Sequence, residues 1–259
     1  MERDYEERVA LVTGASSGIG RETALMVARR GGRVVATGRN ESALEVLQDE
    51  AAGASGEIVR LSGDLTDDGF RERLAAFATE AGGSGGLDLL VNAAGIIGSG
   101  SVESTSLEAF DGMMDINVRT LFDLTRHCLP ALEVAHGAIV NVSSVTGTRA
   151  FPGVLAYCVS KAAVDQMTRC MALDLAPKGV RVNAVNPGVV RTNLHRNGGM
   201  DEESYAAFLE RSAATHPLGR PGEPEEVAEL IAFLGSARAG WITGECVAID
   251  GGRAQTCAR

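Results

Sequence analysis

The sequence predicts an α/β fold in which helices cover both faces of a parallel sheet. Short apolar runs with strand character alternate along the chain with longer amphipathic segments. Most of the apolar runs are continuous rather than alternating, which is typical of strands buried on both faces. A regular strand–helix alternation implies βαβ units. We therefore expect one doubly wound, Rossmann-type parallel sheet of about seven strands.

The predicted elements follow one another without an internal repeat. The strand runs are Val9–Thr13, Arg33–Thr37, Glu57–Leu61, Leu87–Asn92, Ala138–Ser143, Arg181–Asn186 and Glu245–Ile249. The amphipathic segments predict helices at Arg21–Arg30, Ser42–Ala52, Asp67–Ala81, Leu107–Leu132, Tyr157–Ala176 and Pro224–Leu234. The Gly82–Gly86 run is expected to be the turn between a helix and the next strand, because neither flank breaks the alternation.

One segment departs from this alternation. Residues 191–220 are polar, contain Gly198 and Gly199, and follow the sixth strand run. We interpret this segment as a mobile lid within a single domain that spans residues 1–259.

Composition narrows the classes of function. The 259 residues include 24 Lys and Arg against 34 Asp and Glu, so the formal net charge is −10. Apolar residues make up 45% and charged residues 22%, which excludes disordered and fibrous proteins. The acidic balance argues against a nucleic-acid partner, and an aromatic content of 4% argues against a platform that stacks single strands. A small anionic ligand stays compatible with this charge, because a few local donors can bind it.

The cysteines and the N-terminal residues indicate the cellular compartment in which the protein is expected. The five cysteines are scattered, odd in number and never spaced as C-x-x-C, which indicates reduced thiols without a zinc site or disulfides. The first ten residues lack the apolar region of a signal peptide, and their acidic residues argue against a transit peptide. No run approaches the ~18 apolar residues of a membrane helix. We therefore expect a soluble, cytoplasmic protein with no membrane association and no metal.

The first strand runs directly into a glycine-rich turn, TGASSGIG, and then into a helix. Gly14 would allow the tight turn, Gly18 would let the backbone approach a pyrophosphate, and Gly20 would permit close packing. The N–H groups at the start of the helix would face the phosphates. The spacing is G-x-x-x-G-x-G, so a glycine-rich turn without a ligand is the alternative. The other candidate cofactor contacts in this turn are Ser16, Ser17 and Ile19.

If the pyrophosphate belongs to a dinucleotide cofactor, the second strand should end beside the adenosine ribose of that cofactor. An NAD site needs an acidic residue at this position to bind the 2′-hydroxyl. Here Gly38 and Arg39 occupy that position. A guanidinium pairs well with a 2′-phosphate, so the sequence favours NADP(H) over NAD(H), with Asn40 as a neighbouring contact. The alternative is that Arg39 is a solvated surface charge.

The third strand ends in LSGDL, which adds Asp64 and Leu65 to the candidate cofactor contacts. The Asp64 carboxylate can accept a hydrogen bond from the adenine amino group. Its alternative role is to cap the next helix, but Thr66 and Asp67 are better placed for that.

Tyr157 and Lys161 are four residues apart at the start of a predicted helix, so both side chains project from one face. A free phenol has a pKa near ~10, and a neighbouring ammonium would lower it toward the range useful for acid–base chemistry. Ser144 closes the strand IVNVSS, so its hydroxyl can emerge at the carboxyl edge of the sheet, where ligands bind in such folds. A Y-x-x-x-K pair alone is more often an ordinary helix surface.

Further motifs accompany these residues: NAAG at Asn92–Gly95, DINV around Asn117, NPG at Asn186–Gly188 and AIDGG at Ala248–Gly252. Together with TGASSGIG, Ser144 and YCVSK, they make essentially the whole chain resemble the short-chain dehydrogenase/reductase family. By this resemblance, Tyr157 would exchange a proton with the substrate oxygen, and Ser144 would hold that oxygen. Lys161 would bind the nicotinamide ribose and lower the pKa of Tyr157. Asn117 would position a water molecule that connects Lys161 to solvent.

The resemblance also implies the path of the cofactor. Asn92, Val190 and Thr192 would lie along it, with the last two near the carboxamide and the phosphates. The remaining candidate contacts belong to the same motifs: Ala93, Gly95, Tyr157, Lys161, Pro187 and Gly188. The Asn92–Gly95 segment is also expected to brace the central strand.

The sequence thus favours an NADP(H)-dependent oxidoreductase that interconverts a ketone and a secondary alcohol, most similar to the 3-oxoacyl reductase and carbonyl reductase branch. A homotetramer is expected from the family. The first alternative is an NAD-linked alcohol, sterol or polyol dehydrogenase, in which Arg39 has no role. The second is a non-catalytic dinucleotide-binding scaffold or regulator, which would predict loss of Tyr157 or Lys161. The lid composition admits acidic, acyl or bulky apolar substrates, and its His195 could contact substrate or lie in solvent.

Overall fold

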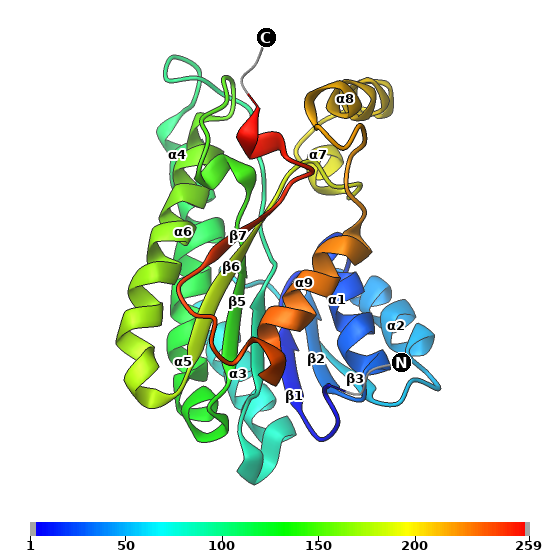
Figure 1. Ribbon diagram of the computed structural model, residues 1–259, viewed down its shortest axis with the longest axis vertical. Coiled ribbons are helices and arrows are strands. Elements are labelled where there is room, and N and C mark those ends of the chain that lie inside the picture. The colour runs from blue at the N-terminus through cyan, green and yellow to red at the C-terminus, as the bar shows by residue number, and fades with distance from the viewer. Residues whose placement is uncertain (1–3, 257–259) are drawn as a thin grey trace.

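The computed structural model describes residues 4–256. Its centre is one sheet with the strand order β3-β2-β1-β4-β5-β6-β7 (Figure 1). The strands are β1 (Val9–Val12), β2 (Arg33–Gly38), β3 (Glu57–Ser62), β4 (Leu89–Asn92), β5 (Ala138–Val142), β6 (Arg181–Pro187) and β7 (Cys246–Ile249). Every neighbouring pair is parallel. The predicted seven-stranded, doubly wound sheet is confirmed, with each strand end within two residues of its expected place.

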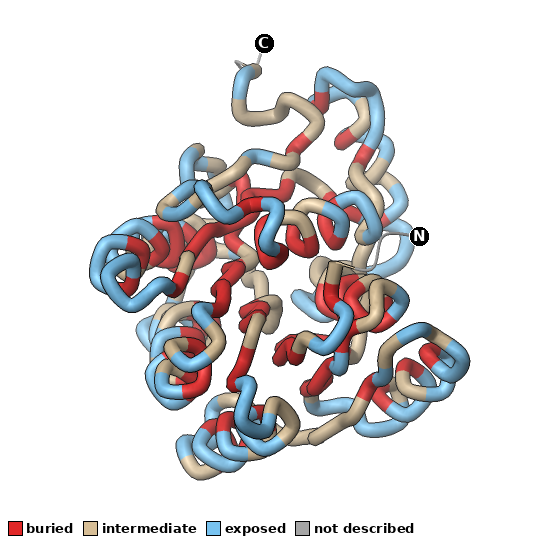
Figure 2. Tube along the Cα trace, turned by 60° about the horizontal axis from the view of Figure 1, so that its bottom comes forward, coloured by how far each residue is buried: buried red, intermediate tan, exposed pale blue. Residues whose placement is uncertain are grey.

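Helices cover both faces of this sheet. The first face carries α1 (Gly18–Arg29), α2 (Glu41–Glu50) and α9 (Pro224–Gly235), and the second carries α3 (Asp68–Gly82), α5 (Thr120–Ala135) and α6 (Leu155–Leu175). The helices turn buried sides to the sheet and exposed sides to solvent, whereas the central strands are buried throughout (Figure 2). No helix within residues 4–256 is long and apolar enough to cross a membrane.

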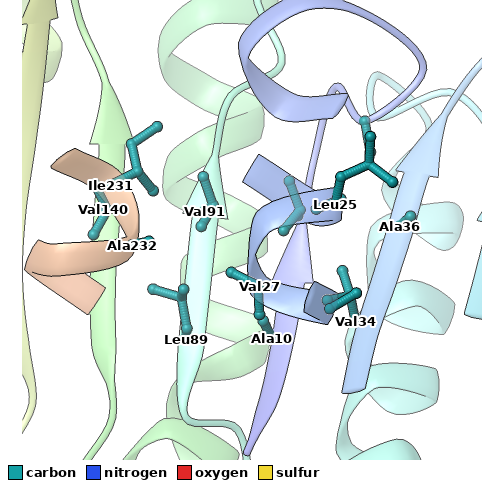
Figure 3. Close-up of a cluster of buried hydrophobic side chains, with 14 of the residues drawn as sticks. Ala10, Leu25, Val27, Val34, Ala36, Leu89, Val91, Val140, Ile231 and Ala232 are labelled. Atoms are coloured by element: carbon teal, nitrogen blue, oxygen red, sulfur yellow. The ribbon is translucent and has the colours of Figure 1, made fainter. Parts of the chain in front are cut away.

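Strand β1 explains why its run is apolar at every position. Ala10 and Val12 belong to the hydrophobic core of the first face, whereas Val9 and Leu11 belong to the core of the second. Alternate side chains of one strand therefore fill two different cores. Figure 3 shows part of the first core, in which Leu25 and Val27 of α1 and Ile231 and Ala232 of α9 lie among side chains of β1, β2, β4 and β5.

The expected helix over 107–132 is interrupted. The structure has α4 (Leu107–Met114), a π-helical turn at Asp115–Arg119, and then α5. The wider turn encloses Asn117, whose side chain is buried. Such π turns occur as single-turn interruptions of α-helices, and nothing in the amphipathic pattern of the sequence marked this one.

The segment 191–220 contains two helices, which the sequence analysis did not predict. These are α7 (Leu194–Asn197) and α8 (Glu202–Thr215), and they lie beyond the sheet, apart from the two helical layers (Figure 1). Asp201 caps α8 by accepting a hydrogen bond from the Ser204 backbone N–H at 2.8 Å. The polar composition reflects an exposed helix rather than an irregular loop.

The strand order places a ligand site. From β1, the chain adds β2 and β3 on one side and then returns to add β4 to β7 on the other. At such a reversal the connections after neighbouring strands diverge, which opens a crevice at the carboxyl ends of β1 and β4. The glycine-rich turn follows β1, and the NAAG motif follows β4.

Candidate active site

The turn after β1 is shaped by glycines. Gly14 has φ +65° and lies so close to the chain after β4 that a Cβ would come within 2.9 Å of the Ala93 carbonyl oxygen. A Cβ on Gly20 would lie 2.5 Å from the Gly14 carbonyl oxygen. Helix α1 begins at Gly18 without a side-chain cap from Ser17 and without an acidic residue in its first turn. This cradle therefore offers space and free backbone donors to a phosphate-bearing group, and fits the pyrophosphate of a dinucleotide.

Thr13 is a residue that the sequence analysis missed. Its buried hydroxyl accepts hydrogen bonds from the backbone N–H groups of Ala93 at 3.0 Å and Ala94 at 3.1 Å. It also donates to the Val91 carbonyl oxygen at 3.2 Å. Thr13 thus ties the glycine turn to the NAAG segment. Thr13 directly precedes the first glycine of the turn. That position indicates a link to the NAAG segment only when β1 and β4 are known to be neighbouring strands.

At the end of β2, Arg39 is exposed and makes no ion pair with a carboxylate of the described residues. The hydroxyl of Ser16 lies 3.0 Å from the position of a Cβ on Gly38, so the turn after β1 closely approaches the end of β2. Arg39 is also near Asp64, because its charge contributes to a lowered pKa of that carboxyl.

Asn40 and Asp64 make local hydrogen bonds. Asn40 caps α2 by accepting from the Ala43 N–H at 3.0 Å. Asp64 accepts from the backbone N–H and the hydroxyl of Thr66, both at 2.9 Å, and the backbone bond is the main cause of its lowered pKa. The helix α3 is capped by Asp67, as expected. The exposed carboxylate of Asp64 keeps free acceptor capacity.

Tyr157, Ser144 and Lys161 meet at one wall of a cavity. Tyr157 is 6% exposed, and its hydroxyl makes a hydrogen bond with Ser144. Lys161 Nζ lies 5.7 Å from the centroid of the Tyr157 ring and donates to the Val142 carbonyl oxygen at 2.8 Å. The three polar groups are therefore held together by the end of β5 and the first turns of α6.

The pKa of Tyr157 differs from the expectation based on the sequence. Burial raises the pKa of Tyr157 to about 12, although the hydrogen bond with Ser144 acts in the opposite direction. Burial also lowers the pKa of Lys161 to about 8. The expectation that Lys161 lowers the pKa of Tyr157 is therefore wrong for the chain alone. Spacing showed that the two residues are neighbours, but not that both are withdrawn from water.

Asn117 lies behind this wall, in the π-helical turn. Its Oδ1 accepts from the Ile96 N–H at 2.9 Å, and its Nδ2 lies 3.0 Å from both the Ile96 carbonyl oxygen and the Ser160 hydroxyl. A Cβ on Gly95 would lie 3.2 Å from Asn117 Oδ1 and 3.6 Å from Lys161 Nζ. Asn117 and Lys161 thus approach the same glycine from two helices.

Asp165 and Asn186 form a buried pair that the sequence analysis did not propose as site residues. Asn186 Nδ2 donates to the Ser144 carbonyl oxygen at 2.9 Å and to Asp165 Oδ2 at 2.8 Å. Burial raises the pKa of Asp165, whose charge in turn acts on Lys161. Asn186, held by Asp165, therefore fixes the position of the Ser144 backbone. Asp165 lies one helical turn after Lys161, and that spacing is the signal that was overlooked.

His216 supports the NPG segment. Its Nε2 accepts from the Val189 N–H at 3.1 Å, so Nδ1 carries the proton and donates to the Ser212 carbonyl oxygen at 2.7 Å. A Cβ on Gly188 would lie 2.8 Å from His216 Nε2. The sequence analysis found no role for His216, because nothing in the sequence places residue 216 beside residue 188.

One cavity of about 500 Å³ joins these features. It is lined by most of the predicted site residues: Ser17, Gly18, Ile19, Gly20, Ala93, Gly95, Ser144, Tyr157, Lys161, Pro187, Gly188, Val190 and Thr192. The others do not line it: Gly14, Ser16, Arg39, Asn40, Asp64, Leu65, Asn92 and Asn117. Asn92 points into the sheet, where its Nδ2 donates to Asn141 Oδ1 at 3.0 Å, so the bracing role expected for this segment is what its side chain performs.

Comparison with known proteins agrees with this geometry. A family model described as enoyl-(acyl carrier protein) reductase matches residues 14–254. The 3-oxoacyl-(acyl-carrier-protein) reductase of Thermotoga maritima is 37% identical over 249 residues, which cover 95% of this chain and 98% of that protein. The cyclohexanol dehydrogenase of an Acinetobacter species is 35% identical over 254 residues, which cover 97% and 96%.

The fold has similar solved counterparts. A short-chain dehydrogenase/reductase of unknown function from Caenorhabditis elegans, solved with cofactor, superposes with a TM-score of 0.92. It is 31% identical to this chain, and the match covers 98% of both chains.

Proposed function

Because the chain belongs to the short-chain dehydrogenase/reductase family of NAD(P)-dependent oxidoreductases, we propose that its cavity interconverts a ketone and a secondary alcohol with NADP(H). The observation that carries this proposal is that Tyr157, Ser144 and Lys161 line the same cavity as the glycine cradle after β1. The cofactor, when bound, supplies the hydride.

The proposed roles follow from the geometry. Tyr157 Oη would give a proton to the carbonyl oxygen during reduction and take it back during oxidation. The Ser144 hydroxyl, beside Tyr157, would donate a hydrogen bond to that oxygen as negative charge develops. Lys161 would bring a positive charge near the phenol and bind the ribose. The buried, raised-pKa state of Tyr157 suits a group that must be protonated when a ketone arrives.

Asn117 would act behind these groups. Its side chain fixes the backbone of Ile96 beside the cavity and shares the space next to Gly95 with Lys161. We propose that a water molecule held there links Lys161 to solvent, so that Tyr157 is reprotonated after each turnover.

A coupled screen tests the function. Purified protein would be mixed with ketones and NADPH or NADH, and with secondary alcohols and NADP or NAD, while the reduced cofactor is followed by absorbance. We expect reduction of a diketone such as diacetyl with NADPH. A protein that binds NADPH but reduces no carbonyl compound would instead be a nucleotide-binding scaffold.

The preference for NADP(H) would rest on Arg39. Its exposed guanidinium makes no ion pair within residues 4–256, although Asp64 is near, and β2 ends in glycine rather than an acidic residue. We expect Arg39→Asp to lower kcat/KM with NADPH relative to NADH by roughly 10- to 100-fold, because a charge-assisted hydrogen bond is lost and a repulsion is added. Arg73→Asp, an equal charge change on the exposed face of α3, is the control. An unchanged ratio would make Arg39 a bystander and favour the NAD-linked alternative.

The assembly is proposed to be a homotetramer. Exposed apolar side chains occur on the helices of the second face, including Phe122 of α5 (47% exposed) and Val159 (42%) and Leu173 (78%) of α6. Such side chains support a face that is covered by another copy. Sedimentation of the purified protein tests this, and a monomer at working concentration would contradict it.

We also propose that α7 and α8 form the lid over the substrate. We further propose that the protein is cytoplasmic, which is consistent with four free cysteines among the described residues.

A further inference from the structure

The cavity is positively charged in an otherwise acidic protein. The chain carries a net charge of −10, yet none of the described residues that line the cavity is Asp or Glu. Its charged lining consists of Lys161, Arg211 and Arg253. Lys161 belongs to the cluster at Tyr157, which leaves two arginines without a role in the proposed function.

Arg211 differs from the other arginines of the 191–220 segment. Arg191, Arg196 and Arg220 each form an ion pair, with Glu223, Glu202 and Glu226 respectively. Arg211 lies on α8, is exposed, and pairs with no carboxylate in the part of the chain that the structure describes. The arginine that faces the cavity is thus the one whose charge is left uncompensated.

Arg253 reaches the same end of the cavity from the C-terminal segment. Its Nη1 donates to the Thr215 carbonyl oxygen at 3.4 Å and to the Thr256 hydroxyl at 3.2 Å. Thr215 lies one helical turn after Arg211 on α8. The guanidinium of Arg253 also lies 5.1 Å from the centroid of the Phe151 ring, in the segment that joins Ser144 to Tyr157. It makes no ion pair with a carboxylate within residues 4–256.

These arginines are not among the residues proposed to hold the pyrophosphate or the 2′-phosphate of the cofactor. The pyrophosphate cradle touches the start of the lid, since a Cβ on Gly18 would lie 3.0 Å from Thr192 Cγ2. Arg39, proposed for the 2′-phosphate, lies at the end of β2 and does not line the cavity. Thr215 links the two arginines, because its carbonyl oxygen accepts from Arg253 and Arg211 lies one helical turn before it on α8.

Two rings line the cavity on the same segment as Arg211. The rings of His195 and Phe208 pack with their centroids 4.5 Å apart, and both line the cavity. Burial lowers the pKa of His195, which keeps its ring neutral at pH 7. The charge at this end therefore comes from the two guanidinium groups, and the ring pair supplies an apolar wall.

We propose that Arg211, assisted by Arg253, binds an anionic group of the substrate, so that the preferred carbonyl compound carries a carboxylate or a phosphate. An arginine fork pairs with either group through two parallel hydrogen bonds. The Phe208–His195 wall contacts the apolar part that joins the anion to the carbonyl group. This inference rests on the proposed function, because it names the substrate class for the same cavity.

Matched pairs of substrates test the inference. Benzoylformate and levulinate would be compared with their methyl esters, and dihydroxyacetone phosphate with dihydroxyacetone, by kcat/KM with NADPH. We expect the anionic member of at least one pair to be favoured by about 10- to 100-fold, the discrimination of one charge-assisted hydrogen bond. A preference confined to the phosphate pair assigns a phosphate, and one confined to the acids assigns a carboxylate.

Variants assign the preference to its source. Arg211→Met should lower the anion-to-neutral ratio by about 10-fold or more, and Arg253→Met by less, because Arg253 is already engaged by Thr215 and Thr256. Arg73→Met, which removes an equal charge from α3 away from the cavity, should leave the ratio unchanged. Neutral members favoured in every pair, or an equal ratio in wild type and Arg211→Met, would overturn the inference.

The same compounds can also be tested as competitive inhibitors of diacetyl reduction. This assay detects a compound that binds the cavity but is not itself reduced. The anions should inhibit more strongly than their neutral counterparts, and Arg211→Met should abolish the difference. If diacetyl is reduced but the anions do not inhibit better, the inference fails and the proposed function stands. If no carbonyl compound is reduced, the proposed function itself fails.

Discussion

Tyr157→Phe should keep NADPH affinity and lose turnover by about 10²- to 10⁴-fold, the usual contribution of a positioned acid–base group. The ring sits in a buried site, 6% exposed, so phenylalanine fills the same space and leaves the cavity wall in place. The change removes the Oη proton and the hydrogen bond with Ser144. Steady-state kcat with diacetyl measures the loss, and fluorescence titration with NADPH measures affinity.

Tyr5→Phe is the matched control. Tyr5 is fully buried, and its hydroxyl donates to the Ala232 carbonyl oxygen at 2.6 Å, remote from the cavity. That variant also loses a buried phenolic hydroxyl, at a cost of about 1 kcal/mol of stability, but should keep its kcat. A Tyr157→Phe enzyme with kcat near that of wild type would show that the proton comes from another group.

Lys161→Met should also remove turnover, yet raise the melting temperature at pH 7 by a few degrees Celsius. Lys161 is 5% exposed, and burial lowers its pKa from 10.5 to about 8. At pH 7 its charge is therefore held in a poorly solvated site, and folding carries that cost. Methionine has a similar length and carries no charge. The substitution at this position should therefore lower activity and raise stability.

The pH dependence identifies the cause of this gain. Below pH 8 the lysine is charged in both the folded and unfolded chains, and the full cost is present. Between pH 8 and 10.5 the unfolded chain binds more protons than the folded one, so the stability of wild type rises with pH. The advantage of Lys161→Met should shrink across that window. Lys178→Met, at an exposed lysine paired with Glu133, should show no such advantage at pH 7. A Lys161→Met variant that melts below wild type would refute the buried-charge account.

The sheet was predictable because burial on both faces leaves a direct mark on the sequence. A strand such as β1 must be apolar at consecutive positions when its alternate side chains enter two cores. The segment 191–220 was less predictable because its helices lie outside those cores and carry a polar pattern. Even so, Asp201 followed by two glutamates is a helix start that the sequence displays.

The candidate site was predictable where its geometry is local. Tyr157 and Lys161 share a helix face, and the glycines share one turn, so spacing alone brings them together. The contacts of Thr13 with Ala93 and of His216 with Val189 join residues far apart in the chain, and no spacing rule reaches them. The pKa of Tyr157 was predicted with the wrong sign for the same reason, because its burial depends on tertiary packing.

Transfer of an isotope label tests the central claim most directly. Purified wild-type protein would receive NADPH that carries deuterium at the transferable position, together with diacetyl, and the alcohol would be analysed by mass spectrometry. The account predicts that deuterium appears on the former carbonyl carbon in step with the loss of NADPH absorbance. NADPH that binds the protein but stays unoxidised with every carbonyl compound would contradict it.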